Sequence, residues 1–315
     1  MNAPAAPPAI NRTMTPIQWL MLIALSSLWG ASFLFLGVSV SALPVFTVIF
    51  LRVLIAAVIV YAAMRLAGEN LPRTREAWRA FFIMSLLNNI FPFLLLGFGQ
   101  KYIAIGLAAV LTAATPIIAN VTAHFMWSDE PFTANRVVGV ILGIVGVAVM
   151  FGTSAFHGIG INFWAELACL GAAICFGLSG VYGRRLGQLG ITPLPASTGQ
   201  LIISSGIMVV LAFGFDQPWT LSWPAPHIVW AVIGLAVLST ALAYIFYYRL
   251  LRQVGSTNTV LVTVLLPVFA VFYGAVLLHE RLEPRHYIGF AIVIIGLAAT
   301  DGRVLRWIGG RMRAG

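Results

Sequence analysis

Charged residues are scarce in this chain, and long hydrophobic runs take their place. Of its 315 residues, 9% are charged and 60% are hydrophobic, whereas an average soluble domain has about 25% charged and about 45–50% apolar residues. This deficit excludes an ordinary soluble domain. We therefore expect an all-α integral membrane protein, because a helix satisfies its own backbone hydrogen bonds inside the lipid bilayer.

Residues that hold nucleotides or metal ions are scarce as well. Lys101 is the only lysine, and the absence of a G-x-x-x-x-G-K-[ST] loop excludes ATP binding of the P-loop kind. The histidines are scattered, so no His/Cys/Asp cluster predicts a metal site. Cys169 and Cys175 are about 9 Å apart along one helix, too far to form a disulfide with each other. We expect no cofactor and no catalytic activity.

The excess of basic residues does not follow the pattern of a nucleic-acid-binding surface. The net charge is +9, but the arginines lie in short gaps between apolar runs rather than on one basic face. Basic loops are typical of the cytoplasmic side of membrane proteins. With a cytoplasmic N-terminus, fourteen arginines lie inside and only Lys101, Arg281 and Arg285 lie outside. Both termini are then cytoplasmic, and nucleic acid is not an expected partner.

Ten apolar runs are long enough to cross about 30 Å of hydrocarbon. The first five lie at about 17–38, 43–64, 78–98, 102–126 and 135–152, and the second five at about 162–182, 194–214, 227–248, 255–278 and 286–302. Because five is odd, the second half enters the membrane in the opposite orientation. We therefore predict two inverted five-helix repeats, at residues 16–153 and 154–302. A disordered tail (1–15) and a basic cytoplasmic tail (303–315) are expected to flank them.

A pattern of five residues occurs once in each half. Its members are Thr112, Pro116, Glu130, Gly139 and Gly146, repeated as Thr263, Pro267, Glu280, Gly289 and Gly296. A proline inside a helix removes the hydrogen bond to the carbonyl four residues back, which in both copies belongs to the threonine. In lipid, that carbonyl needs a partner in the protein or in a wet cavity. The two points are candidate substrate contacts, or kinks that the threonine hydroxyl and a neighbouring helix satisfy.

Several short motifs resemble one known family. They are Trp29-Gly30-Ala31-Ser32 in the first run, Pro44-x7-Arg52 in the second, and proline followed by glutamate in the fourth and ninth. Together with the ten runs they resemble the EamA type of the drug/metabolite transporter superfamily, over about residues 17–302. The resemblance implies a multi-pass carrier of the bacterial inner membrane that exports small metabolites or drugs by alternating access. The stretch 88–93 and the aromatic residues near 227–248 resemble bacterial amino-acid exporters of the aromatic amino-acid and paraquat type.

The densest polar point at mid-membrane depth is expected at Asn88 and Asn89. Pro92 removes the hydrogen bond to the Asn88 carbonyl. Amides buried in lipid are costly unless they are paired, so they either hold neighbouring helices together or face a wet cavity. We predict that both asparagines contact substrate and that Pro92, like Pro116 and Pro267, shapes or gates the site.

Arg52 is the only charged residue expected near the centre of a span, where a charge costs a few kcal/mol or more. We expect it to have partners inside the protein. The favoured role is a brace to carbonyls or a neighbouring helix end, and the alternative is a counter-charge for a substrate carboxylate. Glu166, near the outer end of the sixth run, could protonate within the protein, but we expect an interfacial carboxylate that faces water. Glu130 and Glu280, just past the fourth and ninth runs, are expected to stabilise the N-terminus of the next helix.

Aromatic and small hydroxyl residues complete the candidate substrate site. Trp29 and Tyr244 offer stacking or cation–π contacts, and Ser32 and Ser179 occupy equivalent positions in the two halves. With the two asparagines and two threonines, the predicted substrate-binding set is Trp29, Ser32, Asn88, Asn89, Thr112, Ser179, Tyr244 and Thr263.

The favoured function is export of neutral or zwitterionic metabolites, above all amino acids, by a secondary carrier. Few charges lie within the spans, which argues against direct pairing with a strongly charged substrate. The alternatives are a multidrug exporter of aromatic cations, a passive channel, and a membrane enzyme acting on lipids. That last class needs converging acids or histidines, which are dispersed here. The loops are short, so no obligatory protein partner is expected.

Overall fold

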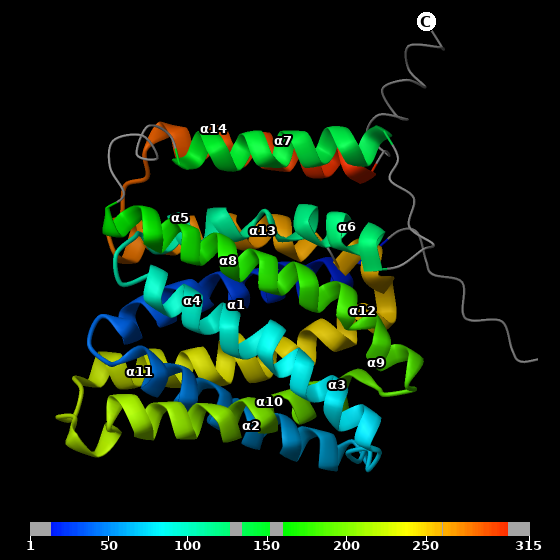
Figure 1. The fold of residues 1–315 in the computed structure, drawn as a ribbon, viewed down its shortest axis with the longest axis vertical. Helices are drawn as coiled ribbons and strands as arrows, with labels where there is room; N and C mark the ends of the chain where they lie inside the picture. The colour runs from blue at the N-terminus through cyan, green and yellow to red at the C-terminus, as the bar shows by residue number, and fades with distance from the viewer. Residues whose placement is uncertain (1–13, 127–133, 152–159, 260, 302–315) are drawn as a thin grey trace, which may run out of the picture.

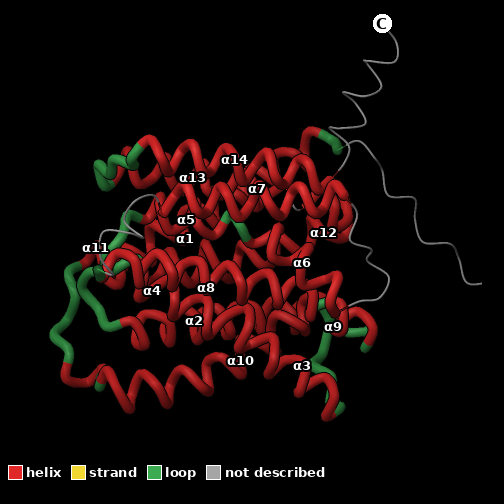
Figure 2. Tube along the Cα trace, turned by 45° about the horizontal axis from the view of Figure 1, so that its top comes forward, coloured by secondary structure: helices red, strands yellow, loops and turns green. Residues whose placement is uncertain are grey.

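The computed structural model describes residues 14–126, 134–151, 160–259 and 261–301 (Figure 1). Every regular element within these ranges is a helix, and most connections are short loops (Figure 2). The expected tails at 1–15 and 303–315 lie outside the described residues, apart from residues 14 and 15.

The first half of the chain forms the earlier helices. They are α1 (Pro16–Val40), α2 (Val45–Leu66), α3 (Arg75–Ser85), the π-helical turn η1 (Leu86–Ile90), α4 (Phe91–Gly99), α5 (Ile105–Thr112), α6 (Thr115–Met126) and α7 (Ala134–Phe151). Because η1 joins α3 directly to α4, these three elements make one long rod.

The second half forms the remaining helices. They are α8 (Ile161–Tyr182), α9 (Arg184–Gln188), α10 (Pro193–Leu211), the π-helical η3 (Ala212–Asp216), the 3₁₀ turn η4 (Pro218–Thr220), α11 (Pro226–Ala236), the π-helical η5 (Val237–Leu242), α12 (Ala243–Thr259), α13 (Leu261–Leu277) and α14 (Pro284–Asp301). Here α11, η5 and α12 are continuous.

Seven of the described helical segments are long and apolar enough to cross a membrane. They are 16–40, 45–66, 75–99, 105–125, 161–188, 193–216 and 226–251. Three shorter apolar helices cover 137–151, 261–277 and 284–299. The chain is therefore a multi-pass membrane protein. Each expected run overlaps one of these segments, but ten complete crossings remain a prediction, because three helices are short within the described ranges.

Helices from the two halves pack against each other in pairs. Figure 1 shows α7 beside α14 at one edge of the molecule and α2 with α10 at the opposite edge, and both pairs are in contact. Between these edges, α1 packs on α13 and α8 packs on α4, α5 and α6. The halves are thus interleaved rather than separate.

The α2–α10 pair is capped at both ends by carboxylates from the opposite helix. Asp216, just after α10, accepts hydrogen bonds from the backbone nitrogen (2.7 Å) and hydroxyl (2.9 Å) of Thr47 in the first turn of α2. Glu69, just after α2, accepts one from Thr192, the N-cap of α10. A carboxylate is favourable at a helix N-terminus. The end of each helix therefore contacts the beginning of the other, as expected for two antiparallel helices.

The repeated glycines bring α7 and α14 into backbone contact. A Cβ added at Gly289 would lie 2.5 Å from the Gly146 carbonyl oxygen, and one at Gly296 would lie 2.8 Å from that of Gly139. Small residues of this kind allow close helix approach in membranes. Each copy of the sequence pattern therefore packs against the other copy.

The three prolines predicted to shape the spans have different effects on their helices. At Pro116 the helix is interrupted, because α5 ends at Thr112 and α6 begins at Thr115. Pro92 follows the π-helical turn η1, which takes up the hydrogen-bond mismatch that a proline creates. Pro267 is buried within α13, which continues through it. The sequence predicts a proline kink in each copy. In the structure the helix is interrupted in the first copy and continues through the proline in the second.

Glu280 joins the end of α13 to the beginning of α5. Its carboxylate accepts hydrogen bonds from the backbone nitrogens of Ile105 (2.8 Å) and Gly106 (3.2 Å). His279, the residue before Glu280, has a backbone in the left-handed region, with φ of 54°. The sequence suggests that this acid stabilises the next helix in the chain, α14, but the turn directs it to α5 in the other half. Its counterpart, Glu130, lies outside the described residues.

Replacing Glu280 with glutamine is expected to lower the free energy of unfolding by about 1–2 kcal/mol. Glutamine keeps the length of the side chain but removes the charge and points an N–H₂ group at one of the two backbone nitrogens. Thermal unfolding in detergent measures the effect. Glu283→Gln is the matched control, because that side chain is 62% exposed and pairs only with Arg285 among the described residues. Equal losses for the two variants would contradict the assigned contact.

Candidate functional site

A network of amide and hydroxyl side chains lies where η1 meets α8, α10 and α12. Its members are Asn88 and Asn89 from η1, Ser179 from α8, Gln200 and Ser204 from α10, and Tyr244 from α12. Four of these six residues belong to the predicted substrate-binding set. The network connects residues of the first half to residues of the second.

Asn88 contacts three helices through one side chain. Its Nδ2 donates to Gln200 Oε1 (3.1 Å) and to the Tyr244 hydroxyl (3.2 Å). Its Oδ1 accepts from the Ser179 hydroxyl at 3.2 Å, which also lies 2.8 Å from the Phe176 carbonyl. One hydroxyl proton is therefore shared between two acceptors.

Asn89 closes the network on the other side of Tyr244. The tyrosine hydroxyl donates to Asn89 Oδ1 (3.0 Å), and Asn89 Nδ2 donates to the Ser204 hydroxyl (3.1 Å). The Ser204 hydroxyl in turn donates to the backbone carbonyl of Gln200 at 2.7 Å. This chain of bonds satisfies polar groups that would be costly to bury alone.

The π-helical turn explains how two adjacent asparagines enter one network. In a regular α-helix, neighbouring residues point about 100° apart. The extra residue of a π turn widens the helix locally, and such turns are frequent at functional sites. Asn89 is fully buried, whereas Asn88 is half-buried. Asn88 is thus the more accessible of the two amides.

Arg52 on α2 has its partners within the protein. Its Nε donates to the Thr240 hydroxyl (3.0 Å) in η5, and its guanidinium carbon lies 3.5 Å from the centre of the Phe93 ring on α4. The residue is 4% exposed. No described carboxylate pairs with it, and only Nε hydrogen-bonds to the described residues. The guanidinium therefore joins the π-helical η5 to α4, and no acid among the described residues compensates its positive charge.

Four predicted substrate contacts lie outside the network. Trp29 packs on Tyr247, with ring centroids 5.3 Å apart and planes tilted by 38°. Ser32 is buried in α1, and the Thr112 hydroxyl donates to the Ala109 carbonyl of its own helix at 2.7 Å. Thr263 is half-buried in α13. The structure does not link these four residues to Asn88.

Gln200, Ser204 and Thr240 are network or Arg52 partners that the sequence analysis missed. Gln200 and Ser204 are four residues apart on α10 and so share one face of the helix. A glutamine among apolar residues at membrane depth is a usable signal. No comparable signal marks Thr240, because its role depends on a π-helical turn that contains no proline.

Glu166 does not face water as expected from the sequence. It is 5% exposed, and its Oε2 has no hydrogen-bond partner among the described residues. Close packing of α4 on α8 explains the burial, because a Cβ on Gly99 would lie 3.0 Å from the Ala165 carbonyl oxygen. The hydropathy of the run gives no indication of this contact.

The network around Asn88 offers hydrogen bonds rather than ion pairs. Its polar groups are neutral amides and hydroxyls, and the charge beside it belongs to Arg52, which also interacts electrostatically with Tyr244. Among the described residues, no group of three His, Cys, Asp or Glu side chains could hold a metal ion. Such a site can bind a small polar molecule through hydrogen bonds to amides and hydroxyls.

Comparisons with known proteins identify a family. The sequence profile of the EamA-like transporter family matches residues 17–152 and again residues 163–300. The chain is 23% identical to YoaV, an uncharacterized transporter of Bacillus subtilis, over 88% of this chain and 94% of that one. It is 24% identical to YvbV, another uncharacterized transporter of that organism, over 90% of each. A solved crystal structure aligns with a TM-score of 0.63 and 19% identity over 89% of this chain and 96% of the other, a likeness of fold alone.

Proposed function

Because this chain belongs to the EamA-like transporter family, we propose that it is a secondary carrier that exports small neutral or zwitterionic metabolites, with amino acids as the favoured class. The family and the apolar helices make the chain a multi-pass membrane transporter. Its substrate class and its transport mechanism are what we propose.

The observation that carries the proposal is the network around Asn88. It combines donors and acceptors from both halves, at a helix position where a π turn breaks the regular backbone pattern. A polar solute could exchange hydrogen bonds with the accessible Asn88 amide, so it would gain partners at mid-membrane depth without requiring an ion pair.

The Arg52 guanidinium could attract the carboxylate end of an amino acid. The guanidinium has no carboxylate partner among the described residues and lies against Phe93, four residues beyond Asn89. A substrate carboxylate would be favourable near this charge, and the amides and hydroxyls of the network could accept a substrate ammonium. The bracing role also fits the observed contacts, and both roles are compatible with a zwitterion.

We propose alternating access between two inverted five-helix repeats, residues 16–153 and 154–302. The double match of the family profile and the reciprocal caps of α2 and α10 support the repeats. In such carriers, one repeat rocks against the other around a central site. We further propose the bacterial inner membrane as the location, with cytoplasmic termini, from the distribution of arginines.

Uptake of labelled threonine, methionine and phenylalanine into proteoliposomes tests the function. Purified protein is expected to give saturable uptake above that of empty liposomes, with and without an imposed proton gradient. A response to the gradient would indicate coupled transport, and no response would indicate facilitated transport. Correctly inserted protein that gives no uptake of any of the three would overturn the amino-acid proposal.

Export of aromatic cations is the second candidate, and the packed rings of Trp29 and Tyr247 favour it. Aromatic faces attract cations, by about 0.5–2 kcal/mol per contact. Expression that protects growing cells against paraquat-like cations, without protecting them against excess amino acids, would favour this candidate over the first.

A further inference from the structure

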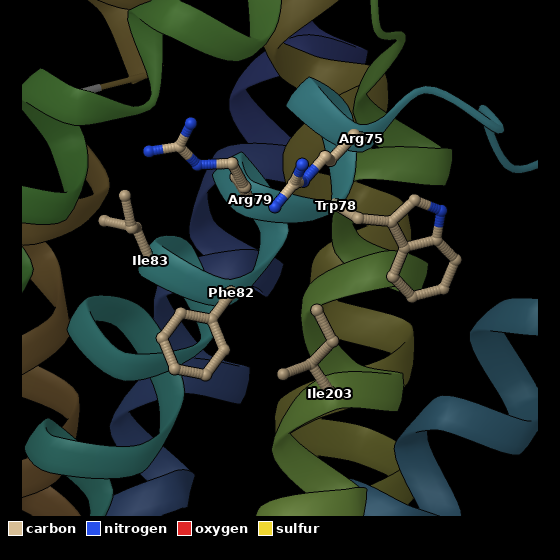
Figure 3. A pocket seen from close by; sticks show the side chains of 6 residues that line it. All are labelled: Arg75, Trp78, Arg79, Phe82, Ile83 and Ile203. Carbon is tan, nitrogen blue, oxygen red and sulfur yellow. The ribbon is translucent and has the colours of Figure 1, made fainter.

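A hollow opens between α3 and α10, away from the Asn88 network. Its volume is about 560 Å³, and it is lined by Arg75, Trp78, Arg79, Phe82, Ile83 and Ile203. Figure 3 shows the Arg75 and Arg79 guanidinium groups on one level, with Phe82 and Ile203 below them. The hollow thus has a cationic end and an apolar end.

The cationic end has no partner of its own. Arg75 and Arg79 are four residues apart on α3 and so share one face of the helix. Both are exposed, and neither forms a hydrogen bond or ion pair within the described part of the chain. The lining includes no acid. Glu76 lies on the same helix but is not one of the lining residues. Two guanidinium groups at this spacing can hold one phosphate between them.

The apolar end is backed by a wall of aromatic side chains, Trp78 and Phe81, that contacts within the protein hold in place. Trp78 Nε1 donates to the Pro72 carbonyl at 3.0 Å, and its ring meets the edge of Phe81 with centroids 5.8 Å apart. Phe81 is fully buried and packs on Gly199 of α10. The wall therefore holds its shape, while Phe82 remains 48% exposed.

The position of the hollow corresponds to a membrane boundary. Arg75 is the first residue of the membrane-crossing segment 75–99. Tryptophan and arginine are enriched at the headgroup level, and basic pockets between helices bind anionic headgroups. One turn further along α3, the side chains reach the depth of acyl chains.

We propose that this hollow binds an anionic glycerophospholipid, with its phosphate between Arg75 and Arg79 and an acyl chain along Phe82, Ile83 and Ile203. The lipid bridges α3 and α10. The same two helices carry the network, since Ile203 precedes Ser204 and α3 leads directly into Asn88 and Asn89. Lipid occupancy therefore stabilises the α3–α10 arrangement on which the network depends.

Native mass spectrometry of the full chain, released from detergent with added lipid, tests the site. The probes are dioleoyl phosphatidylglycerol, dioleoyl phosphatidylcholine and glycerol 3-phosphate, which isolate the effects of charge and of acyl chains. The wild type is expected to bind phosphatidylglycerol at least about 10-fold more tightly than phosphatidylcholine. The double variant Arg75→Ala/Arg79→Ala is expected to lose this preference.

Arg73→Ala/Arg185→Ala is the matched control. It removes two exposed arginines near the same end of α3 that do not line the hollow. This control is expected to keep the preference for phosphatidylglycerol, and Phe82→Ser is expected to weaken binding while both arginines remain. Equal phosphatidylglycerol binding by the two arginine double variants would overturn the site. Competition by glycerol 3-phosphate as effective as by the lipid would replace it with a site for small anions.

Discussion

Asn88→Ala is expected to abolish transport by this protein while leaving it folded and inserted in the membrane. The substitution removes the amide that contacts Gln200, Tyr244 and Ser179 at 3.1, 3.2 and 3.2 Å. It leaves the side-chain oxygen Oε1 of Gln200, a residue that is buried, without the donor that Asn88 supplies. Each buried group left without a partner costs about 1–3 kcal/mol.

The expected decrease in transport rate is about 100-fold or more. The three lost hydrogen bonds are worth about 1 kcal/mol each, and about 1.4 kcal/mol corresponds to a factor of ten. Initial rates of labelled amino-acid uptake into proteoliposomes measure it, after size-exclusion chromatography has shown that the variant is monodisperse. Asn88→Asp, which keeps the shape but replaces the donor by an acceptor, is expected to fail as well.

Ser205→Ala provides the control for this prediction. Ser205 is buried on α10 beside the network, but its hydroxyl donates only to the Leu201 carbonyl of its own helix at 2.8 Å. Its loss removes a polar group of similar depth without disconnecting two helices, so near-normal uptake is expected. Normal uptake by Asn88→Ala would remove Asn88 from the site, whatever the control shows.

Gly289→Ala is expected to produce the largest loss of stability among single methyl additions. The new Cβ would lie 2.5 Å from the Gly146 carbonyl oxygen, 2.5 Å from Met150 Cγ and 3.1 Å from the Met150 backbone nitrogen. Two of these atoms are backbone, so the helices must separate along the contact. Overpacking in a close-packed interior typically costs about 1–3 kcal/mol. We expect a loss at the upper end of that range.

Thermal unfolding in a fixed detergent compares this variant with Gly206→Ala. A Cβ at Gly206 on α10 would meet nothing within 4 Å, and replacing a helical glycine by alanine stabilises by about 0.5–1 kcal/mol. The control is therefore expected to be neutral or slightly more stable. If Gly289→Ala unfolds at the wild-type midpoint, the close approach of α7 and α14 does not contribute to stability.

The sequence was sufficient to locate the helical segments and to single out several polar residues that meet in one network. Long apolar runs predicted helical segments that the structure contains, because hydrophobic length is a local property. Asn88 and Asn89 were identified as polar residues at mid-membrane depth and Ser179 as a candidate hydroxyl contact, and the structure places them in one network with Tyr244. An amide in lipid has to be paired, so its presence alone predicts a contact.

Contacts between distant segments were not predictable in the same way. Gln200 and Thr240 became visible as partners only after α10 and η5 were placed beside η1 and α2. Glu280 was assigned to the next helix, but the left-handed turn at His279 directs it to α5. The two prolines share one sequence pattern, yet the helix is interrupted near Pro116 and continues through Pro267 in the structure.

The sequence by itself determined that this chain is helical and membrane-bound and that it carries one residue pattern twice, since composition, run length and spacing can be read along the chain. Only the tertiary structure decided which amides share hydrogen bonds, that Arg52 rests on Phe93, and that Glu166 is buried. These properties depend on how helices far apart in the chain approach each other. That approach is fixed by side-chain packing and glycine contacts across the whole bundle, which no single stretch of sequence contains.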